Sequence, residues 1–420
     1  MSDTARNSPR PSRRETLQSA IAAALQVMLL LAILWRAACF AGLLGPHLSN
    51  IFVDFNAIYL AGRMALHGTL IAAYDTHTMY AAEAAVGGAA TPMSWAYPPQ
   101  FDLIAATLAL LPRGLAYLAF MLPAFLAYMF ALHRLAGDRF LEAFAIVFPA
   151  LLVTIMTGQN GTMTGAFVGL FALATLQGRS LAGIPLGLMV IKPHLAVGLT
   201  VLTVARCRWS VIAIAAAVTL GSGVLATLAF GTGVWPAFLS GARQSGALLT
   251  EGAYLMFRLT SVYAAIRSFG APLGLAMTVQ IVTAGLSMGL VAYTVWCRWS
   301  ARLQLGMAVL CTLSISPYIY DYDMAIFGIA LALILPDLLA RASRLEHTAF
   351  IALAAVSTGW SAALTVLYGQ GTDPSPQAIA VHSASVAGVT YLALIAFAAV
   401  VLRRPLGAKD AVRHQGLAVI

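Results

Sequence analysis

The chain has 420 residues, of which 60% are hydrophobic and only 9% are charged, and its mean hydropathy is +0.86. This composition excludes an ordinary water-soluble fold and favours a polytopic helical membrane protein, because apolar runs long enough to cross a bilayer recur from end to end. The runs lack the alternating pattern of a transmembrane β-barrel. The net charge of +9 does not indicate nucleic acid as a partner, since the basic residues stand in short clusters between apolar runs.

Clusters of arginine predict how the chain crosses the membrane. Residues 1–16 carry Arg6, Arg10, Arg13 and Arg14, so this segment is expected to be disordered and cytoplasmic by the positive-inside rule. Later basic clusters mark further cytoplasmic ends, and the C-terminal tail, residues 405–420, is also expected inside. The first apolar run is too long for a cleavable signal peptide and is expected to remain as an anchor.

Residues 17–404 are predicted to form one transmembrane domain of about 10–12 helices. The predicted spans are residues 20–44, 114–134, 140–157, 161–177, 210–232, 271–296, 303–318, 322–339, 347–368 and 377–402. Two long extracytoplasmic loops, residues 45–113 and 233–270, contain amphipathic stretches that are expected to lie along the membrane surface.

Two apolar stretches do not fit a simple span. Residues 101–111 lie between Pro99 and Pro112 and are too short to cross a bilayer, so an interfacial or re-entrant helix is expected. Residues 181–205 are interrupted by Lys192-Pro193, and both flanks resemble cytoplasmic ends. This pattern predicts either a tight hairpin of two short helices or a broken re-entrant pair.

Polar residues gather where the predicted topology places the outer side of the membrane. An ionisable group at membrane depth is costly unless it is paired or hydrated, so such residues are candidates for one functional site. The candidates are Asp54, Arg63, His67, Tyr97, Gln159, Asn160, Lys192, His194, Arg258, Tyr318 and Asp321.

Structural roles could also account for these residues one at a time. Asp54 could cap the helix that begins there. Lys192 could snorkel to the interface, or pair with Asp321 for stability alone. The Asp and Tyr residues of 320–323 could form an ordinary interfacial belt, and the other candidates could cap helix ends or contact lipid headgroups.

A carboxylate at a water-accessible membrane face, with cations and amides nearby, suits group transfer. It can act as a general base on an acceptor hydroxyl while the cations neutralise a departing phosphate. A lipid-phosphate donor is the natural case, since the chain has no P-loop and its cytoplasmic loops are too short for a nucleotide-binding domain. The four cysteines lack the spacing of metal ligands, so no metal site is predicted.

The ordered motifs "VDFNAIYLAGRMALHG", "AYD", "YPP", "GQN", "IKP" and "SPYIYDYD" resemble those of glycosyltransferase family 87. This family comprises integral-membrane GT-C enzymes related to polyprenol-phosphate-mannose-dependent mannosyltransferases. The resemblance covers roughly residues 20–340 and implies the GT-C fold.

The resemblance also implies a reaction. A hexose, most commonly mannose, would pass from a polyprenyl-phosphate donor to a lipid or glycan acceptor, at the extracytoplasmic face of a bacterial-type plasma membrane. The reaction would be an inverting single displacement without metal or cofactor, with Asp54 as general base. Lys192, or alternatively Arg63 or Arg258, would hold the leaving phosphate. The sugar pocket would be lined by Tyr97, Gln159, Asn160 and Tyr318.

Two other classes of protein remain open from the sequence. A transporter or flippase of lipid-linked sugar or small solute would also gather charges and broken helices at the membrane midplane. Against it stand the missing internal repeat and the long first outer loop. A non-catalytic scaffold, or a polymerase or ligase acting on lipid-linked glycans, would share the same geometry.

Overall fold

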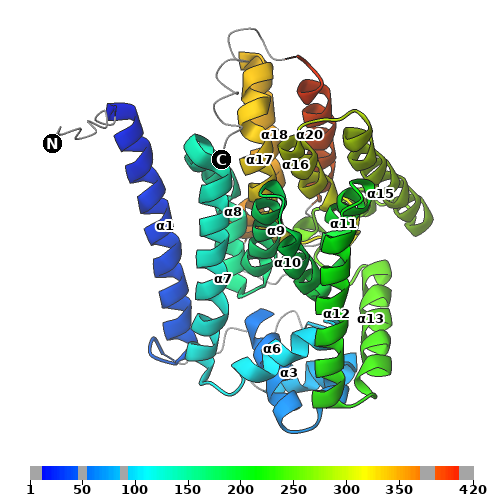
Figure 1. The fold of residues 1–420 in the computed structure, drawn as a ribbon. Coiled ribbons are helices and arrows are strands. Elements are labelled where there is room, and N and C mark those ends of the chain that lie inside the picture. Colours follow the sequence, from blue (N-terminus) through cyan, green and yellow to red (C-terminus); the bar gives the residue numbers. More distant parts are fainter. Residues whose placement is uncertain (1–11, 46–53, 86–92, 369–383, 406–420) are drawn as a thin grey trace, which may run out of the picture.

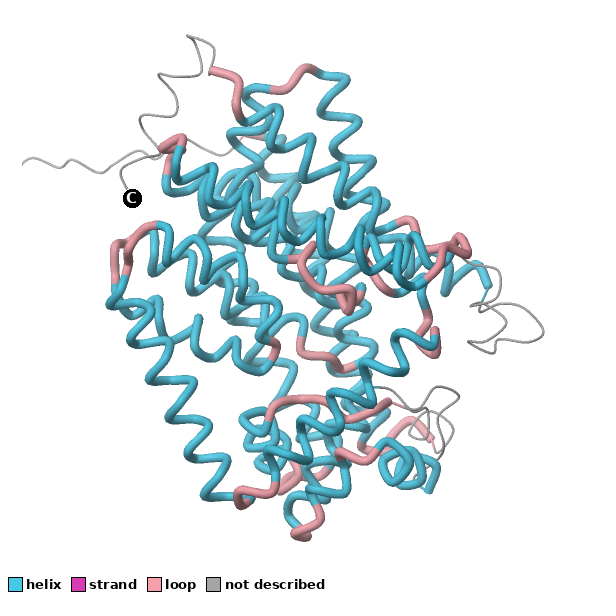
Figure 2. Tube along the Cα trace, turned by 90° about the vertical axis from the view of Figure 1, so that its right-hand side faces the viewer, coloured by secondary structure: helices cyan, strands magenta, loops and turns pink. Residues whose placement is uncertain are grey.

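The computed structural model describes residues 12–45, 54–85, 93–368 and 384–405. Figure 2 shows that these residues form helices joined by loops, and their strand-like pairing is limited to a single bridge between Leu259 and Tyr320. Helices are expected in a bilayer, because each apolar segment must satisfy its own backbone hydrogen bonds away from water. The prediction of an all-α polytopic membrane protein is confirmed.

Within the described residues, six helical segments are long and apolar enough to cross a membrane. One of them, Arg113–Thr157, contains two helices joined by a 3-10 turn at Gly137–Arg139. The long helices are α1 (Arg13–Phe40), α7 (Arg113–Ala136), α8 (Phe140–Thr157), α12 (Trp209–Phe230), α15 (Leu273–Trp296), α17 (Ala325–Arg341) and α18 (Arg344–Tyr368). Shorter apolar helices include α9 (Gly161–Leu176), α16 (Ala301–Thr312) and α20 (Ala387–Leu402).

Most predicted spans agree with these helices to within a few residues, and the differences lie at their ends. The helix α1 begins at Arg13, inside the segment expected to be disordered, and ends at Phe40. The helix α16 ends at Thr312 because the chain then turns toward the "SPYIYDYD" segment. Part of the last predicted span, residues 377–383, lies outside the described residues, and so do the tail residues 406–420.

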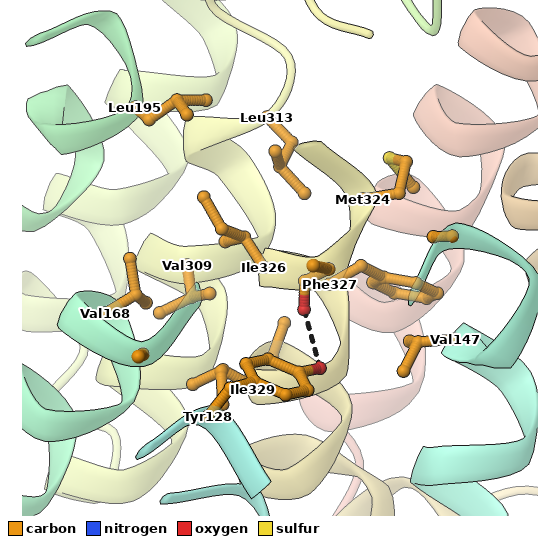
Figure 3. Packing of buried hydrophobic residues seen from close by; sticks show 14 of the residues in the cluster. Tyr128, Val147, Val168, Leu195, Val309, Leu313, Met324, Ile326, Phe327 and Ile329 are labelled. Carbon is orange, nitrogen blue, oxygen red and sulfur yellow. Dashed lines mark hydrogen bonds between the residues drawn. The ribbon is translucent and has the colours of Figure 1, made fainter. Parts of the chain in front are cut away.

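The central helix of the bundle is α17. It is buried along most of its length and packs against α7, α8, α9, α16 and α20. Figure 3 shows this core, where the hydroxyl of Tyr128 on α7 donates to the backbone oxygen of Ala325 at 2.8 Å. A short 3-10 turn, Asp321–Met324, leads into α17. Two carboxylates therefore enter the protein interior at the N-terminal end of this helix, where the helix dipole favours negative charge.

The first long loop folds into short helices at one end of the bundle (Figure 1). The helices are α3 (Asp54–Leu66), α4 (Leu70–Ala73), α5 (Thr76–Ala85) and α6 (Pro99–Leu108). The stretch near 101–111 forms the ten-residue helix α6, in agreement with its expected short length, and an interfacial or re-entrant position for it stays a prediction. Gly62 allows α3 to lie directly on α6, because a Cβ at this position would overlap the backbone oxygen of Ala105.

The two long loops, predicted separately, dock on each other. The second loop forms α13 (Val234–Glu251), a 3-10 turn at Met256–Arg258, and α14 (Val262–Ser268). The helix α13 packs against α4, α5 and α6, and the backbone N–H of Thr76 donates to Gln244 Oε1 at 3.0 Å. Residues of both loops are thereby held near the start of α17.

The stretch 181–205 breaks at Lys192-Pro193, as predicted. On one side is α10 (Gly183–Leu188) with a 3-10 turn at Met189–Ile191, and on the other a 3-10 turn at Pro193–Ala196 with α11 (Val197–Ala205). The first half packs on α9 and α12, and the second on α15 and α16. The break therefore places the Lys192 side chain inside the bundle.

Candidate active site

The position of Asp54 is fixed by its neighbour Phe55. The ring of Phe55 is fully buried and packs against Phe40 of α1 and Tyr117 of α7, with ring centroids 5.2 Å away in both cases. Burial of such an aromatic ring stabilises the packing by several kcal/mol. The first turn of α3 is therefore anchored between two membrane helices, and Asp54 lies at its start, partly exposed.

The "GQN" motif forms the turn between α8 and α9 and faces Asp54. Gly158 has a φ of +70° and its Cβ position lies 2.5 Å from the Cβ of Phe55, so both conformation and space favour glycine. Gln159 hydrogen-bonds to Asp54. The Tyr97 hydroxyl donates to Gln159 Oε1 at 2.9 Å and accepts from Asn160 Nδ2 at 3.3 Å. Tyr97 of the first loop and the turn thus form one polar network with Asp54.

The start of α17 holds two buried ion pairs. Arg258 donates to both carboxylate oxygens of Asp321 at 3.0 Å, and Ser361 of α18 donates to the same carboxylate at 2.6 Å. Lys192 Nζ lies 2.7 Å from Oδ1 of Asp323. Both aspartates are almost fully buried, so each cation compensates a charge that would otherwise be costly.

Tyrosine rings surround these cations. The rings of Tyr320 and Tyr322 are stacked with centroids 5.1 Å apart. Lys192 Nζ lies 4.5 Å from the ring centroid of Tyr322, and the guanidinium carbon of Arg258 lies 5.6 Å from that of Tyr320. Tyr318 packs edge-on against both Tyr254 and Tyr320. The aromatic faces add cation–π attraction to the ion pairs and complete an aromatic wall.

The electrostatics distinguish Asp54 from the other two acids. Burial raises the pKa of Asp54, while attraction to Arg258, the hydrogen bond with Gln159 and attraction to Lys192 oppose the rise. Among the described residues, Asp54 has no cation at ion-pair distance, whereas Asp321 and Asp323 each have one. A carboxylate in this setting is hydrogen-bonded and near positive charge, yet able to accept a proton.

The structure brings together most of the predicted site residues. Those in or beside this cluster are Asp54, Tyr97, Gln159, Asn160, Lys192, His194, Arg258, Tyr318 and Asp321.

Two of the predicted residues lie apart from this cluster, and Lys192 pairs with a different acid from the one considered in the sequence analysis. Arg63 lies on the exposed face of α3, and His67 lies in the exposed turn that follows this helix, where its ring contacts the backbone oxygen of Arg63. Arg63 comes nine residues after Asp54, about two and a half helical turns, so it points to the opposite side of the helix. Lys192 pairs with Asp323 rather than with Asp321, whose carboxylate is occupied by Arg258.

Other members of the cluster carried little signal in the sequence. Ser361 is one small polar residue inside a membrane helix, and Tyr254 lies in a loop, where its hydroxyl bonds Ser94 at 3.1 Å and Ser245 at 2.8 Å. Asp102 is easier to notice in the sequence than Ser361 or Tyr254, because it is the single acid in the apolar stretch 101–111. Within the described part of the chain, no group of three His, Cys, Asp or Glu side chains is arranged as metal ligands.

Comparison with known protein families identifies a relationship for this chain. The family model of glycosyltransferase family 87 matches residues 95–317, which is more than half of the chain. The matched region holds Tyr97, Gln159, Asn160, Lys192 and Arg258, whereas Asp54 and Asp321 lie outside it. No curated protein and no solved structure matches the chain significantly. The chain belongs to glycosyltransferase family 87, and it is a membrane glycosyltransferase.

Proposed function

We propose that the enzyme transfers a hexose, mannose in the first instance, from a polyprenyl-phosphate donor to a lipid or glycan acceptor with inversion at the anomeric carbon. The observation that carries the proposal is the position of Asp54. It is partly exposed, hydrogen-bonded to Gln159, and without a cation at ion-pair distance among the described residues. Such a carboxylate suits a general base.

The proposed reaction is a single displacement. Asp54 takes the proton of the acceptor hydroxyl as its oxygen bonds to the anomeric carbon. The bond from that carbon to the phosphate oxygen breaks, and its electron pair leaves with the polyprenyl phosphate. Attack and departure occur on opposite faces of the sugar, which gives inversion.

Arg258 is the better candidate to hold the departing phosphate. Its side chain is 20% exposed, compared with 9% for that of Lys192, and the guanidinium retains donors beyond the two that bind Asp321. An incoming phosphate shares this cation with Asp321. Lys192 then acts on the phosphate only at longer range, because its positive charge compensates the negative charge of Asp323.

Unused polar atoms support a sugar pocket beside Asp54. Asn160 Oδ1 and His194 Nε2 are buried and have no hydrogen-bond partner in the described part of the chain. Buried polar atoms generally have partners, so these two are available to hydroxyl groups of a bound sugar. Tyr97 and Tyr318 would supply the aromatic walls.

An apolar groove supports a lipid-linked donor. It lies between α6, α7 and α9, has a volume of about 300 Å³, and its lining includes Ile104, Leu108, Phe120, Pro123, Met163 and Phe167. The ring of Phe120 packs on Phe101 at 6.4 Å, and Phe101 packs on Tyr97 at 4.3 Å. Packed aromatic rings therefore connect the lining of the groove with Tyr97 of the polar cluster, which supports binding of a polyprenyl chain beside the site.

The site is proposed to face the extracytoplasmic side of a bacterial-type plasma membrane, as the positive-inside rule predicts. A direct test uses purified protein in liposomes with a synthetic polyprenyl-phosphate hexose and a panel of lipid acceptors. We expect polyprenyl phosphate to be released in equal amount to glycosylated acceptor. Movement of intact donor across the bilayer without released polyprenyl phosphate would instead identify a transporter.

A further inference from the structure

Asp102 is a buried acid that the proposed reaction does not use. It lies in the first turn of α6 with no exposed surface. Its Oδ2 is 2.5 Å from the hydroxyl oxygen of Tyr74, and its Oδ1 accepts a hydrogen bond from Trp95 Nε1 at 2.9 Å. Both rings are almost completely buried. An ionised carboxylate in such surroundings, without a cation, would be costly.

Counting protons indicates which form Asp102 takes. The hydroxyl oxygen of Tyr74 also lies 2.9 Å from the backbone oxygen of Tyr97. A phenol has one proton, so it can donate to only one of these two neighbours. If Asp102 is ionised, one of the two short contacts contains no proton. If Oδ2 is protonated, it donates to Tyr74, Tyr74 donates to Tyr97, and each contact becomes a hydrogen bond.

The network ends at the candidate active site. Tyr97, whose backbone oxygen accepts from Tyr74, uses its own hydroxyl to bind Gln159 and Asn160. We propose that Asp102 is a neutral carboxylic acid and a positioning residue, whose proton holds Tyr97 in place through Tyr74.

The electrostatic surroundings agree with this assignment. Burial raises the pKa of Asp102 to about 7, and the hydrogen bonds with Tyr74 and Trp95 oppose the rise. The elements packed on α6 are α3, α7, α12, α13 and the 3-10 turn Met189–Ile191. Among their described residues no charged side chain acts on Asp102, and Tyr74 is the titratable group in contact with it.

Infrared difference spectroscopy tests the protonation state without relying on transferase activity. In slightly acidic buffer, the wild type minus Asp102→Asn spectrum should contain the carbonyl stretch of a protonated carboxylic acid. The same subtraction with Asp138→Asn, an exposed acid between α7 and α8, should contain carboxylate bands only. Carboxylate bands in the Asp102→Asn difference would overturn the proposal.

Turnover tests the positioning role, and this arm rests on the proposed function. The asparagine amide can donate to Tyr74 while its oxygen accepts from Trp95, so Asp102→Asn should keep kcat/KM within about twofold. Asp102→Ala should lower kcat/KM on the order of tenfold, which corresponds to one lost hydrogen bond. Wild-type activity should also fall above neutral pH, and Asp102→Asn should lack this fall. Equal losses in both variants would contradict the proposal, and the infrared result stands even if no transfer is detected.

Discussion

Arg258 of the second long loop and Asp321 at the start of α17 form a two-pronged ion pair, with two nitrogen–oxygen distances of 3.0 Å. The pair ties a loop outside the helical bundle to the end of its central helix. An antiparallel contact next to it, in which the N–H of Thr260 donates to the Ile319 oxygen at 2.7 Å, reinforces this connection. The candidate site is therefore built where loop and core meet.

Removing one partner of this pair should destabilise the protein. Asp321→Ala leaves the mostly covered guanidinium of Arg258 without its anion, and the free energy of unfolding should fall by about 3 kcal/mol. Glu346→Gln is the matched control, because Glu346 pairs with Arg404 on the surface and such pairs contribute about 0–1 kcal/mol. Thermal unfolding in detergent compares the variants, and equal midpoints would show that the buried pair contributes little.

Gly161 should be required for the contact between the "GQN" turn and α17. Its Cβ position overlaps the backbone oxygen of Tyr322, so Gly161→Ala must separate the two segments and should cost about 1–3 kcal/mol. Gly246→Ala is the control, since open space surrounds the Cβ position of this helical glycine and its φ is not positive. It should be neutral or slightly stabilising. Equal tolerance of both substitutions would refute the close packing.

Arg63 and His67 should be dispensable for transfer. Arg63 lies on the exposed face of α3, and His67 lies exposed in the turn that follows it. Arg63→Ala and His67→Ala should keep kcat/KM within about twofold, because surface substitutions away from a site have small effects. Steady-state kinetics with the lipid-linked donor measures this. A tenfold loss of kcat/KM would show that Arg63 or His67 takes part in transfer.

The sequence predicted the helices well because length and hydropathy decide which segments enter a bilayer. It also identified the motifs that meet, since ionisable residues in an apolar chain are conspicuous. It could not predict pairing. Whether Lys192 binds Asp321 or Asp323 depends on how α10, α11 and α17 pack, because the two acids are only two residues apart in the same 3-10 turn. Ser361 could not be identified from the sequence, because its role depends on α18 packing beside Asp321.

Stability should depend on pH through Glu83, a buried acid of α5. It accepts the Met93 N–H at 3.0 Å, and burial raises its pKa to about 7, with that hydrogen bond opposing and Asp54 adding to the rise. Because the folded pKa exceeds the unfolded value of about 4.3, the contribution is complete at low pH and is lost as pH rises toward 7. Chemical unfolding across this window should show a smaller decline for Glu83→Gln than for the wild type. Identical slopes would mean that Glu83 is not shifted.

Transfer by Asp54→Asn tests the central claim most directly. The substitution keeps the shape of the side chain and removes the base, so turnover should fall on the order of 10²–10⁴-fold, the usual contribution of general base catalysis. Donor binding, measured separately with the lipid-linked sugar, should be retained. Asp138→Asn, which removes an exposed acid between α7 and α8, should match the wild type. If Asp54→Asn transfers sugar within a few-fold of the wild-type rate, Asp54 is not the base.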